Sequence, residues 1–341
     1  MIMIGHLDKP TETINNNMKR ALITGINGQD GSYLAELLLS KGYEVWGTLK
    51  RNSVSETQTS RLTDDTYKRV NLVYGDLTDL SSLVSVLQQS KPDELYNLAA
   101  QSHVRISFDQ PIYTAQATGV GVLNMLEAVR LTNPAIKIYQ ASSSEMFGNS
   151  IDADGFQRES TPLKPVSPYG CAKVYGHNIC VNYRHSYDMF ISNGILFNHE
   201  SPRRGTNFVT NKVAKEVAKI KLGLSDKLVM GNMDATRDWG HAKDYVEAMW
   251  LILQHDTPDD FVCSTGVSHS VQHLVDYCFS RVGLDPAEYV HQHEKFLRPE
   301  ELHNLKGDCT KAKNTLGWKH VYTFESMMDE MVDHWLNHYK Q

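Results

Sequence analysis

Two side chains in the middle of the chain, Tyr169 and Lys173, have the types and the spacing of an acid–base pair for alcohol oxidation. They lie four positions apart, so on a helix they share a face and the lysine charge can stabilise a tyrosinate. A tyrosine that acts as a base near neutral pH needs its pKa lowered from about 10, which takes about 4 kcal/mol of preferential phenolate stabilisation. Such a base takes the proton of a substrate alcohol while the carbon gives hydride to a nicotinamide. The alternative is a tyrosine and a lysine that merely lie on a surface helix.

A serine-rich segment that ends in a carboxylate, Ser142-Ser143-Ser144-Glu145, follows an expected strand at 137–141. Once C4 of a hexose is oxidised to a ketone, the C5 proton becomes acidic, and a nearby carboxylate can remove it while the C6 hydroxyl leaves as water. Glu145 is the candidate for this second acid–base role, and the Ser143 hydroxyl can hydrogen bond the substrate oxygen at C4 or orient the leaving water. The alternative is that these residues only cap the next turn. Together with the tyrosine, the carboxylate indicates oxidation coupled to elimination.

Three glycines in Thr24-Gly25-Ile26-Asn27-Gly28-Gln29-Asp30-Gly31 mark the turn from a first strand into a helix. A missing Cβ allows the tight turn and lets a pyrophosphate approach the helix amino terminus. The spacing differs from G-x-G-x-x-G, and a purely structural turn uses glycine for the same steric reasons. Because the run follows a buried strand and precedes a leucine-rich helix, it indicates dinucleotide binding.

The end of the next strand indicates which dinucleotide is bound. About 20 residues past the last glycine, where an acidic residue would hold the ribose of NAD, the chain has Lys50-Arg51-Asn52-Ser53. The two cations and the hydroxyl suit a 2′-phosphate, so we expect NADP rather than NAD, with a solvated basic turn as the alternative. Two segments that end the following strands are expected to flank the adenine and the ribose or pyrophosphate: Asp76-Leu77 and Leu98-Ala99-Ala100-Gln101-Ser102.

The order of the expected elements predicts an α/β fold. Strands alternate with helices up to Leu196, which is typical of a Rossmann-type doubly wound parallel sheet with its ligand crevice at the strand carboxyl ends. The expected strands are 20–24, 44–49, 71–74, 94–98, 137–141 and 190–196, and the expected helices are one containing 34–39, then 79–89, 114–132, 169–187, 210–222, 241–254, 271–282 and 324–339. Residues 18–196 and about 232–266 are expected to form the NADP-binding domain. Residues 197–231 and 267–341 are expected to form a smaller mixed α/β substrate lobe, and 1–17 a disordered tail.

Composition narrows the class of protein. With 341 residues and 41% hydrophobic content the chain can bury a full core. A formal charge of −6 without a basic block disfavours nucleic acid as a partner, and no apolar run is long enough to cross a membrane, so we expect a cytoplasmic enzyme. The five cysteines show no C-x-x-C pair, and the histidines lack the cysteine or carboxylate neighbours of a metal site, so no metal is expected.

Four longer stretches, Tyr96–Asp109, Asn193–Gly205, Arg237–Tyr245 and Gly307–Lys313, carry a resemblance to a known family. From Gly25 to about Trp318 the chain resembles the extended short-chain dehydrogenase/reductases, and specifically the GDP-mannose 4,6-dehydratase family. The resemblance implies that Tyr169 deprotonates the sugar O4 while NADP accepts hydride from C4. It further implies that Glu145 drives loss of water across C5 and C6 and that NADPH returns the hydride to C6. The cofactor would be retained and recycled, and the product would be GDP-4-keto-6-deoxy-mannose.

The resemblance also carries binding residues onto this sequence. Its cofactor contacts fall on Gly25–Asp30, Lys50–Ser53, Asp76, Leu77, Leu98–Ser102, Tyr113, Lys173, His199 and Arg204. Its substrate contacts fall on Ser102, Ser143, Glu145, Tyr169, Asn198, Lys212, Arg237, Arg298 and Glu301. Arginines would neutralise the diphosphate, with surface ion pairs as the alternative, and Arg237 is expected just after a strand end.

The chain departs from the family pattern in several places. Ser143 stands where the family commonly has threonine, and Lys50 and Asn52 replace part of an Arg-Arg-Ser run. Asn211 replaces an arginine beside Lys212. Two extra residues around 152–156 lengthen the segment between Glu145 and Tyr169 and could reshape the site.

Three other functions remain open from the sequence. A nucleotide-sugar 4-epimerase needs the tyrosine–lysine pair but has no use for Glu145 as a base at C5. A bifunctional enzyme would make the 4-keto product and reduce it with external NADPH to GDP-rhamnose. A sensor or scaffold would bind NADPH without turnover. Pairing into a homodimer or homotetramer is expected from related folds.

Overall fold

Seven parallel strands form one sheet in the part of the chain that the structure, a computed structural model, describes, namely residues 18–53, 60–293 and 300–340. The strand order is β10-β6-β5-β4-β1-β2-β3, so the direction of winding reverses between β1 and β4. The strands are β1 Arg20–Thr24, β2 Glu44–Leu49, β3 Asn71–Tyr74, β4 Glu94–Asn97, β5 Lys137–Ser143, β6 Ile191–Leu196 and β10 Asp260–Cys263. The predicted doubly wound Rossmann-type sheet is therefore confirmed.

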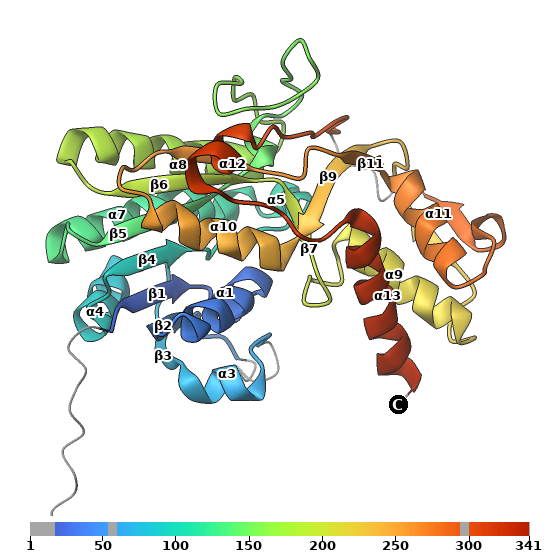
Figure 1. Ribbon diagram of the computed structural model, residues 1–341, viewed down its shortest axis with the longest axis horizontal. Coiled ribbons are helices and arrows are strands. Elements are labelled where there is room, and N and C mark those ends of the chain that lie inside the picture. The colour runs from blue at the N-terminus through green and yellow to red at the C-terminus, as the bar shows by residue number, and fades with distance from the viewer. Residues whose placement is uncertain (1–17, 54–59, 294–299, 341) are drawn as a thin grey trace, which may run out of the picture.

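Helices cover both faces of this sheet (Figure 1). On one face lie α1 (Gln29–Ser40) and α10 (Ala242–Gln254). On the other lie α4 (Leu80–Ser90), α7 (Gly121–Thr132) and α8 (Pro168–Tyr187). The inner strands are covered on both sides, which favours the apolar residues by which they could be predicted from the sequence. The edge strand β3 is only partly buried.

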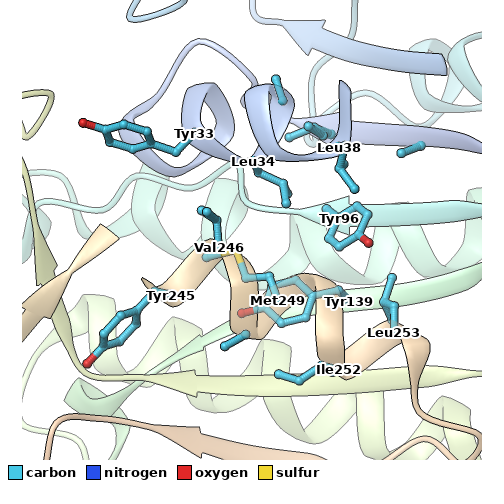
Figure 2. Close-up of a cluster of buried hydrophobic side chains, with 14 of the residues drawn as sticks. Tyr33, Leu34, Leu38, Tyr96, Tyr139, Tyr245, Val246, Met249, Ile252 and Leu253 are labelled. Atoms are coloured by element: carbon cyan, nitrogen blue, oxygen red, sulfur yellow. The ribbon is translucent and has the colours of Figure 1, made fainter. Parts of the chain in front are cut away.

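Figure 2 shows the apolar cluster that fixes α1 and α10 to the sheet. Leu34 and Leu38 of α1 and Met249 of α10 are fully buried in the same cluster as Tyr96 of β4 and Tyr139 of β5. Burying an apolar side chain of this size contributes roughly 1.5–3 kcal/mol. This packing holds the amino terminus of α1 at the carboxyl edge of the sheet.

The helical run that precedes β5 differs from the prediction. Instead of one helix over 114–132, the chain forms α6 (Pro111–Thr114), a π-helical segment η1 (Ala115–Val120) and then α7. The run starts early because proline suits a first helical turn. Gly119 in the π segment faces α8, where an added Cβ would lie 3.4 Å from the Ala172 carbonyl oxygen. Single π turns of this kind often occur at functional sites.

A second group of elements packs around its own apolar cluster. The helix α13 (Phe324–Lys340) packs its buried Met327, Met328 and Met331 in one cluster with residues of α9 (Val209–Lys221) and α11 (Val271–Arg281). A sheet of β7 (Asn198–Glu200), β9 (Thr236–His241) and β11 (Ser268–Ser270) adjoins them, and β8 (Leu228–Met230) pairs with β12 (Val290–Gln292). The sequence predicted these helices to within one residue at each end but missed the strands, which are too short to show alternation.

The remaining elements are short: α3 Asp64–Arg69, α5 Val104–Asp109, α12 Thr310–Leu316, and the 3₁₀ turns η2 Ser144–Met146 and η3 Pro286–Glu288. No helix in the described ranges is long and apolar enough to span a membrane. Within the same ranges no group of three or more His, Cys, Asp or Glu side chains is placed to hold a metal ion. The five cysteines are free thiols. The expected tail at 1–17 lies outside the described residues.

Candidate active site

A cavity of about 890 Å³ lies at the carboxyl edge of the main sheet. Its walls come from the β1–α1 turn, from the ends of β2, β4 and β5, from the first turns of α8, and from β7, α9 and β9. The cavity coincides with the reversal of strand order between β1 and β4, where ligands bind in doubly wound sheets. Its volume is within the range of small-molecule and cofactor sites.

The β1–α1 turn borders this cavity with backbone rather than with side chains. Gly25 has a φ of +70°, and a Cβ there would lie 3.1 Å from the backbone of Ala99, so the position requires glycine. Gly28 precedes α1, and no side chain caps that helix, which leaves its first N–H groups without intrahelical partners. Thr24 Oγ1 accepts the N–H of Leu98 at 3.0 Å and that of Ala99 at 3.1 Å. An uncapped amino terminus in a glycine turn fits the pyrophosphate of a dinucleotide.

The four predicted catalytic residues line one region of the cavity: Ser143, Glu145, Tyr169 and Lys173. β5 ends at Ser143, and η2 carries Glu145 directly after it. The Ser143 hydroxyl is hydrogen bonded to the Tyr169 phenol and accepts the N–H of Glu145 at 3.2 Å. Ser167 caps α8, so Tyr169 and Lys173 occupy its first two turns. Residues distant in the sequence thus form one acid–base cluster.

Burial dominates the ionisation of this cluster. Burial raises the pKa of Tyr169 to about 12, against a smaller lowering by the hydrogen bond to Ser143. Burial also lowers the pKa of Lys173 to about 8. The lysine Nζ donates to the Ala141 carbonyl oxygen at 2.7 Å and lies 5.7 Å from the centroid of the Tyr169 ring. The expected lowering of the tyrosine pKa by the lysine is therefore not seen, because removal from water penalises both charged forms.

The predicted phosphate-binding rim carries a cation that already has partners. Lys50 Nζ donates to the Tyr113 hydroxyl at 3.0 Å and pairs with an Asp76 carboxylate oxygen at 3.1 Å. These contacts raise the pKa of Lys50, the hydrogen bond to Tyr113 having the largest effect. Lys50, Asn52, Asp76 and Tyr113 all line the cavity. A ligand phosphate at this rim would share the lysine with Asp76.

A buried ion pair lies beside the glycine turn. His199 Nε2 is 2.8 Å from Asp30 Oδ2, and His199 Nδ1 is 2.7 Å from the Phe197 carbonyl oxygen. Both ring nitrogens face acceptors, which favours the doubly protonated imidazolium. Burial raises the pKa of Asp30, but the charge and hydrogen bond of His199 outweigh it and lower the pKa to about 2. The Tyr245 ring stacks on the imidazole with 4.6 Å between centroids.

Several predicted cofactor residues do not line the cavity. Ile26 is fully buried below the turn, packed where Gly47 leaves room for it. The Gln101 side chain donates to Thr114 Oγ1 at 3.1 Å and so braces the helical run instead. Two further residues, Arg51 and Ser53, are exposed outside the lining, and the predicted Arg298 lies outside the described residues. The other predicted cofactor residues do line it: Gly25, Asn27, Gly28, Gln29, Asp30, Lys50, Asn52, Asp76, Leu77, Leu98, Ala99, Ala100, Ser102, Tyr113, Lys173, His199 and Arg204.

The predicted nucleotide-sugar residues Asn198, Lys212, Arg237 and Glu301 line the opposite wall. Arg237 is the second residue of β9, not the residue after a strand as expected, and it is only 6% exposed. Its Nη1 donates to the carbonyl oxygens of Thr236 at 2.8 Å and Leu302 at 3.1 Å. Asn198 Oδ1 is buried and has no hydrogen-bond partner among the described residues, so it is an acceptor available to a ligand hydroxyl.

Sequence reasoning missed other lining residues: Arg61, His103, Arg105, Asn207, Phe208 and Asn232. Arg61 follows a segment without periodic pattern, and it reaches the cavity because its Nε donates to the Arg203 carbonyl oxygen at 2.6 Å. The Arg204 guanidinium lies 3.7 Å from the centroid of the Phe208 ring, which places both on the same wall. The motif Ser201–Gly205 indicated a binding wall near Arg204. It could not indicate Arg61, which lies 140 positions before Ser201 in the sequence.

The lowered pKa of Lys173 predicts a specific dependence of stability on pH. Between pH 8 and about 10.5 the unfolded chain keeps the lysine proton that the folded protein has lost, so the free energy of unfolding rises with pH by about 3 kcal/mol. Lys173→Met removes this term. Urea unfolding of both proteins at several pH values measures the difference between their free energies of unfolding. Relative to the original protein, the variant should lose about 3 kcal/mol between pH 8 and about 10.5.

The control for this experiment is Lys68→Met, because Lys68 is exposed on α3. Its difference from the original protein should stay constant over the same window. A constant difference for Lys173→Met as well would contradict the lowered lysine pKa.

Comparison with known proteins identifies the family. Residues 22–331 match the family model described as GDP-mannose 4,6 dehydratase. The chain is 52% identical over 324 residues to GDP-mannose 4,6 dehydratase 1 of Arabidopsis thaliana, covering 92% of this chain and 89% of the relative. It is 50% identical over 340 residues to GDP-mannose 4,6 dehydratase of Homo sapiens, covering 92% and 90%. Among solved structures, dTDP-glucose 4,6-dehydratase of Bacillus anthracis in complex with NAD shares the fold, with a TM-score of 0.81, 21% identity, and coverage of 94% and 98%. The chain therefore belongs to the GDP-mannose 4,6-dehydratase family.

Proposed function

We propose that this protein converts GDP-mannose to GDP-4-keto-6-deoxy-mannose and water, using a nicotinamide dinucleotide held in the cavity. The observation that carries the proposal is the position of Glu145 in the same cluster as Ser143, Tyr169 and Lys173. A dehydrogenase needs only the last three groups. The added carboxylate supplies the second acid–base function that an elimination requires.

Tyr169 and Ser143 handle the proton of the sugar hydroxyl at C4. Their mutual hydrogen bond places the phenol oxygen beside a hydroxyl that can also bind the substrate oxygen. Because burial keeps Tyr169 neutral, the phenol must lose its proton to solvent before it can accept the proton of the C4 hydroxyl. We assign stabilisation of the phenolate to the Lys173 ammonium, which lies 5.7 Å from the centroid of the Tyr169 ring, although burial outweighs its effect in the protein alone. When bound, the nicotinamide ring stores the hydride from C4 and returns it to C6, so the overall reaction consumes no reductant.

Glu145 handles the protons of the elimination. Its carboxylate takes the proton from C5 of the 4-keto sugar, the electron pair forms the C5–C6 double bond, and the C6 hydroxyl leaves as water with a proton from the same carboxyl group. Hydride addition at C6 then leaves an enolate, and its C5 takes a proton from the Tyr169 phenol, which the C4 hydroxyl has protonated and which can exchange with solvent. The residue is 7% exposed, so the site excludes bulk water that would compete for these protons. Its attachment to Ser143 through the N–H at 3.2 Å fixes the distance between the two reactive centres.

Cofactor preference rests on the rim that holds Lys50. We assign the adenosine 2′-phosphate of NADP to Lys50 with its neighbours Arg51 and Asn52, which favours NADP over NAD. The pairing of Lys50 with Asp76 supports this placement, because it fixes an ammonium group at the edge of the cavity. Arg237 and Lys212, which line the cavity, are proposed to hold the GDP diphosphate. Arg298, which the family resemblance adds to this set, lies outside the described residues. A homodimer or homotetramer is also proposed, since folds of this type commonly pair through long helices.

Glu145→Gln tests the elimination directly. We expect the rate of water loss to fall by about 10²-fold or more, since Gln has the size of Glu but cannot accept the C5 proton. Oxidation at C4 should persist, so reduced nicotinamide should appear in a single turnover, followed by its absorbance. Deuterium from heavy water should no longer enter the product at C5. Tyr169→Phe should lose both the reduced nicotinamide and the product.

Glu159→Gln is the matched control, because Glu159 lies in the loop after Glu145 but outside the cavity lining and accepts the Val262 N–H at 2.7 Å. It should retain water loss. Mass and NMR analysis of the product of the original protein, with and without excess NADPH, separates the outcomes. Epimerised sugar without water loss would contradict the dehydratase, and a further gain of two hydrogens would show that the protein also reduces the 4-ketone.

Lys50→Ala tests the cofactor assignment. We expect the dissociation constant for NADP to rise about tenfold or more, the cost of losing a charge-assisted hydrogen bond, while that for NAD changes little. Asp76→Asn keeps the lysine and removes its competing carboxylate, so it should not weaken NADP binding. Titration calorimetry with both dinucleotides measures these constants. If Lys50→Ala weakened the binding of NADP and of NAD equally, the 2′-phosphate would not bind at Lys50.

A further inference from the structure

The segment 301–308, which carries Glu301 into the cavity wall, is bound on one side to β9. The Thr236 N–H donates to the His303 carbonyl oxygen at 2.9 Å, and the Leu305 N–H donates back to Thr236 at 3.3 Å. Arg237 Nη1 adds a bond to the Leu302 carbonyl oxygen at 3.1 Å. The segment is thus an irregular extension of the sheet that contains Arg237. Its other side is bound by a different part of the chain.

That other side is held by the loop that follows the catalytic carboxylate. Asn149 Nδ2 donates to the Glu301 carbonyl oxygen at 3.2 Å, while Asn149 Oδ1 accepts the His303 N–H at 3.1 Å. One amide side chain therefore satisfies two backbone groups on adjacent parts of the segment. Gln157 is fully buried, and its N–H donates to the Lys306 carbonyl oxygen at 2.8 Å. The loop and the segment are joined at both ends of their contact.

An arginine with three carboxylate partners reinforces the contact. Arg158 lies 3.1 Å from Asp152, 2.6 Å from Asp154 and 2.8 Å from Asp308. Asp152 and Asp154 fall in the stretch that the family resemblance predicts to be lengthened, whereas Asp308 belongs to the segment. The guanidinium therefore closes the lengthened loop on itself and ties it across to the segment. Its side chain is 30% exposed, so solvent screens part of the attraction.

The loop begins at a fixed distance from Glu145. Gly148 lies between Glu145 and Asn149, with a φ of +57°, and a Cβ there would come within 1.8 Å of the Lys164 carbonyl oxygen. Only glycine fits such a position. The chain that leaves the elimination base therefore turns in one defined way, and the position of Asn149 follows from that of Glu145.

We propose that Asn149, Gln157 and Arg158 form a clasp that positions the nucleotide-sugar wall of the cavity relative to the elimination base. The clasp acts through the segment 301–308, so its members are positioning residues and do not touch the reacting atoms. The inference rests on the proposed function, because it assigns GDP to the wall that contains Arg237 and Glu301. Binding of the dinucleotide depends on the β1–α1 turn and on the Lys50 rim, which the clasp does not contact.

Asn149→Asp is the sharpest test. Aspartate keeps the size and one acceptor but turns a carboxylate oxygen toward the Glu301 carbonyl oxygen, so one of the two bonds becomes repulsive. We expect the dissociation constant for GDP and the KM for GDP-mannose to rise about tenfold together. The dissociation constant for NADP should not change, and kcat should fall by less than about threefold. Arg158→Ala should behave in the same way, and Arg158→Lys should lie between it and the original protein, since lysine keeps the charge but cannot bridge three carboxylates.

Arg281→Ala is the matched control for loss of a surface arginine. Arg281 bridges Asp329 at 2.9 Å and Asp333 at 3.1 Å between α11 and α13, and it does not line the cavity. It should leave GDP binding unchanged. Titration calorimetry gives the dissociation constants for GDP and for NADP of each variant, and thermal unfolding gives its melting temperature.

The clasp is refuted if folded Asn149→Asp binds GDP like the original protein. It is equally refuted if GDP and NADP affinities fall together with the melting temperature, because that result describes a general structural role. Failure of the proposed function gives a different result. The original protein would then leave GDP-mannose unchanged, whereas the effect of the variants on GDP affinity would still decide whether the clasp exists.

Discussion

The hydrogen bond from the Lys173 ammonium to the Ala141 carbonyl joins the two elements on which the candidate chemistry depends. β5 delivers Ser143 and, through η2, Glu145, while α8 delivers Tyr169. A backbone carbonyl two residues before the end of a strand can accept this bond only if the helix lies directly over that strand end. The bond therefore sets the distance between the redox base and the elimination base. The bond also satisfies the buried Lys173 ammonium, which would be strongly destabilising without an acceptor.

Much of this arrangement could be predicted because the residues involved follow periodic patterns. Parallel strands buried on both faces read as apolar runs, and the strand–turn–helix at Gly25–Gly31 identified the first crossover. Once the sheet was assigned, Ser143, Glu145 and Tyr169 had to meet, because the carboxyl ends of parallel strands share one edge. The family resemblance then gave each of them a role that spacing alone left open. Strand ends and helix starts were therefore the most informative positions.

The sequence could not give the contacts made between irregular segments. The Arg61 N–H donates to the Asn27 carbonyl oxygen at 3.1 Å, and the 301–308 segment is joined to β9 in the same way. Any residue type can make such backbone hydrogen bonds, so they leave no pattern in the sequence. Ile26 shows the reverse error: its motif is a cofactor motif, but a side chain in the middle of a tight turn can face the core. The direction in which the pKa of Tyr169 is shifted also could not be predicted from the sequence. Proximity to a lysine is visible in a sequence, whereas the depth of burial that outweighs it is not.

Three of the cations around the cavity are held in place by acidic partners. Lys50 pairs with Asp76, His199 with Asp30, and Arg204 Nε lies 3.1 Å from Glu200. Each pair lowers the cost of keeping a positive group in a partly buried wall and fixes its direction before any anion arrives. The acidic partners also weaken the field that an incoming phosphate meets, so binding must come from geometry as well as from charge. The two aspartates and the glutamate therefore help to orient the cations of the anion site, although they also reduce the net positive charge that a phosphate would meet.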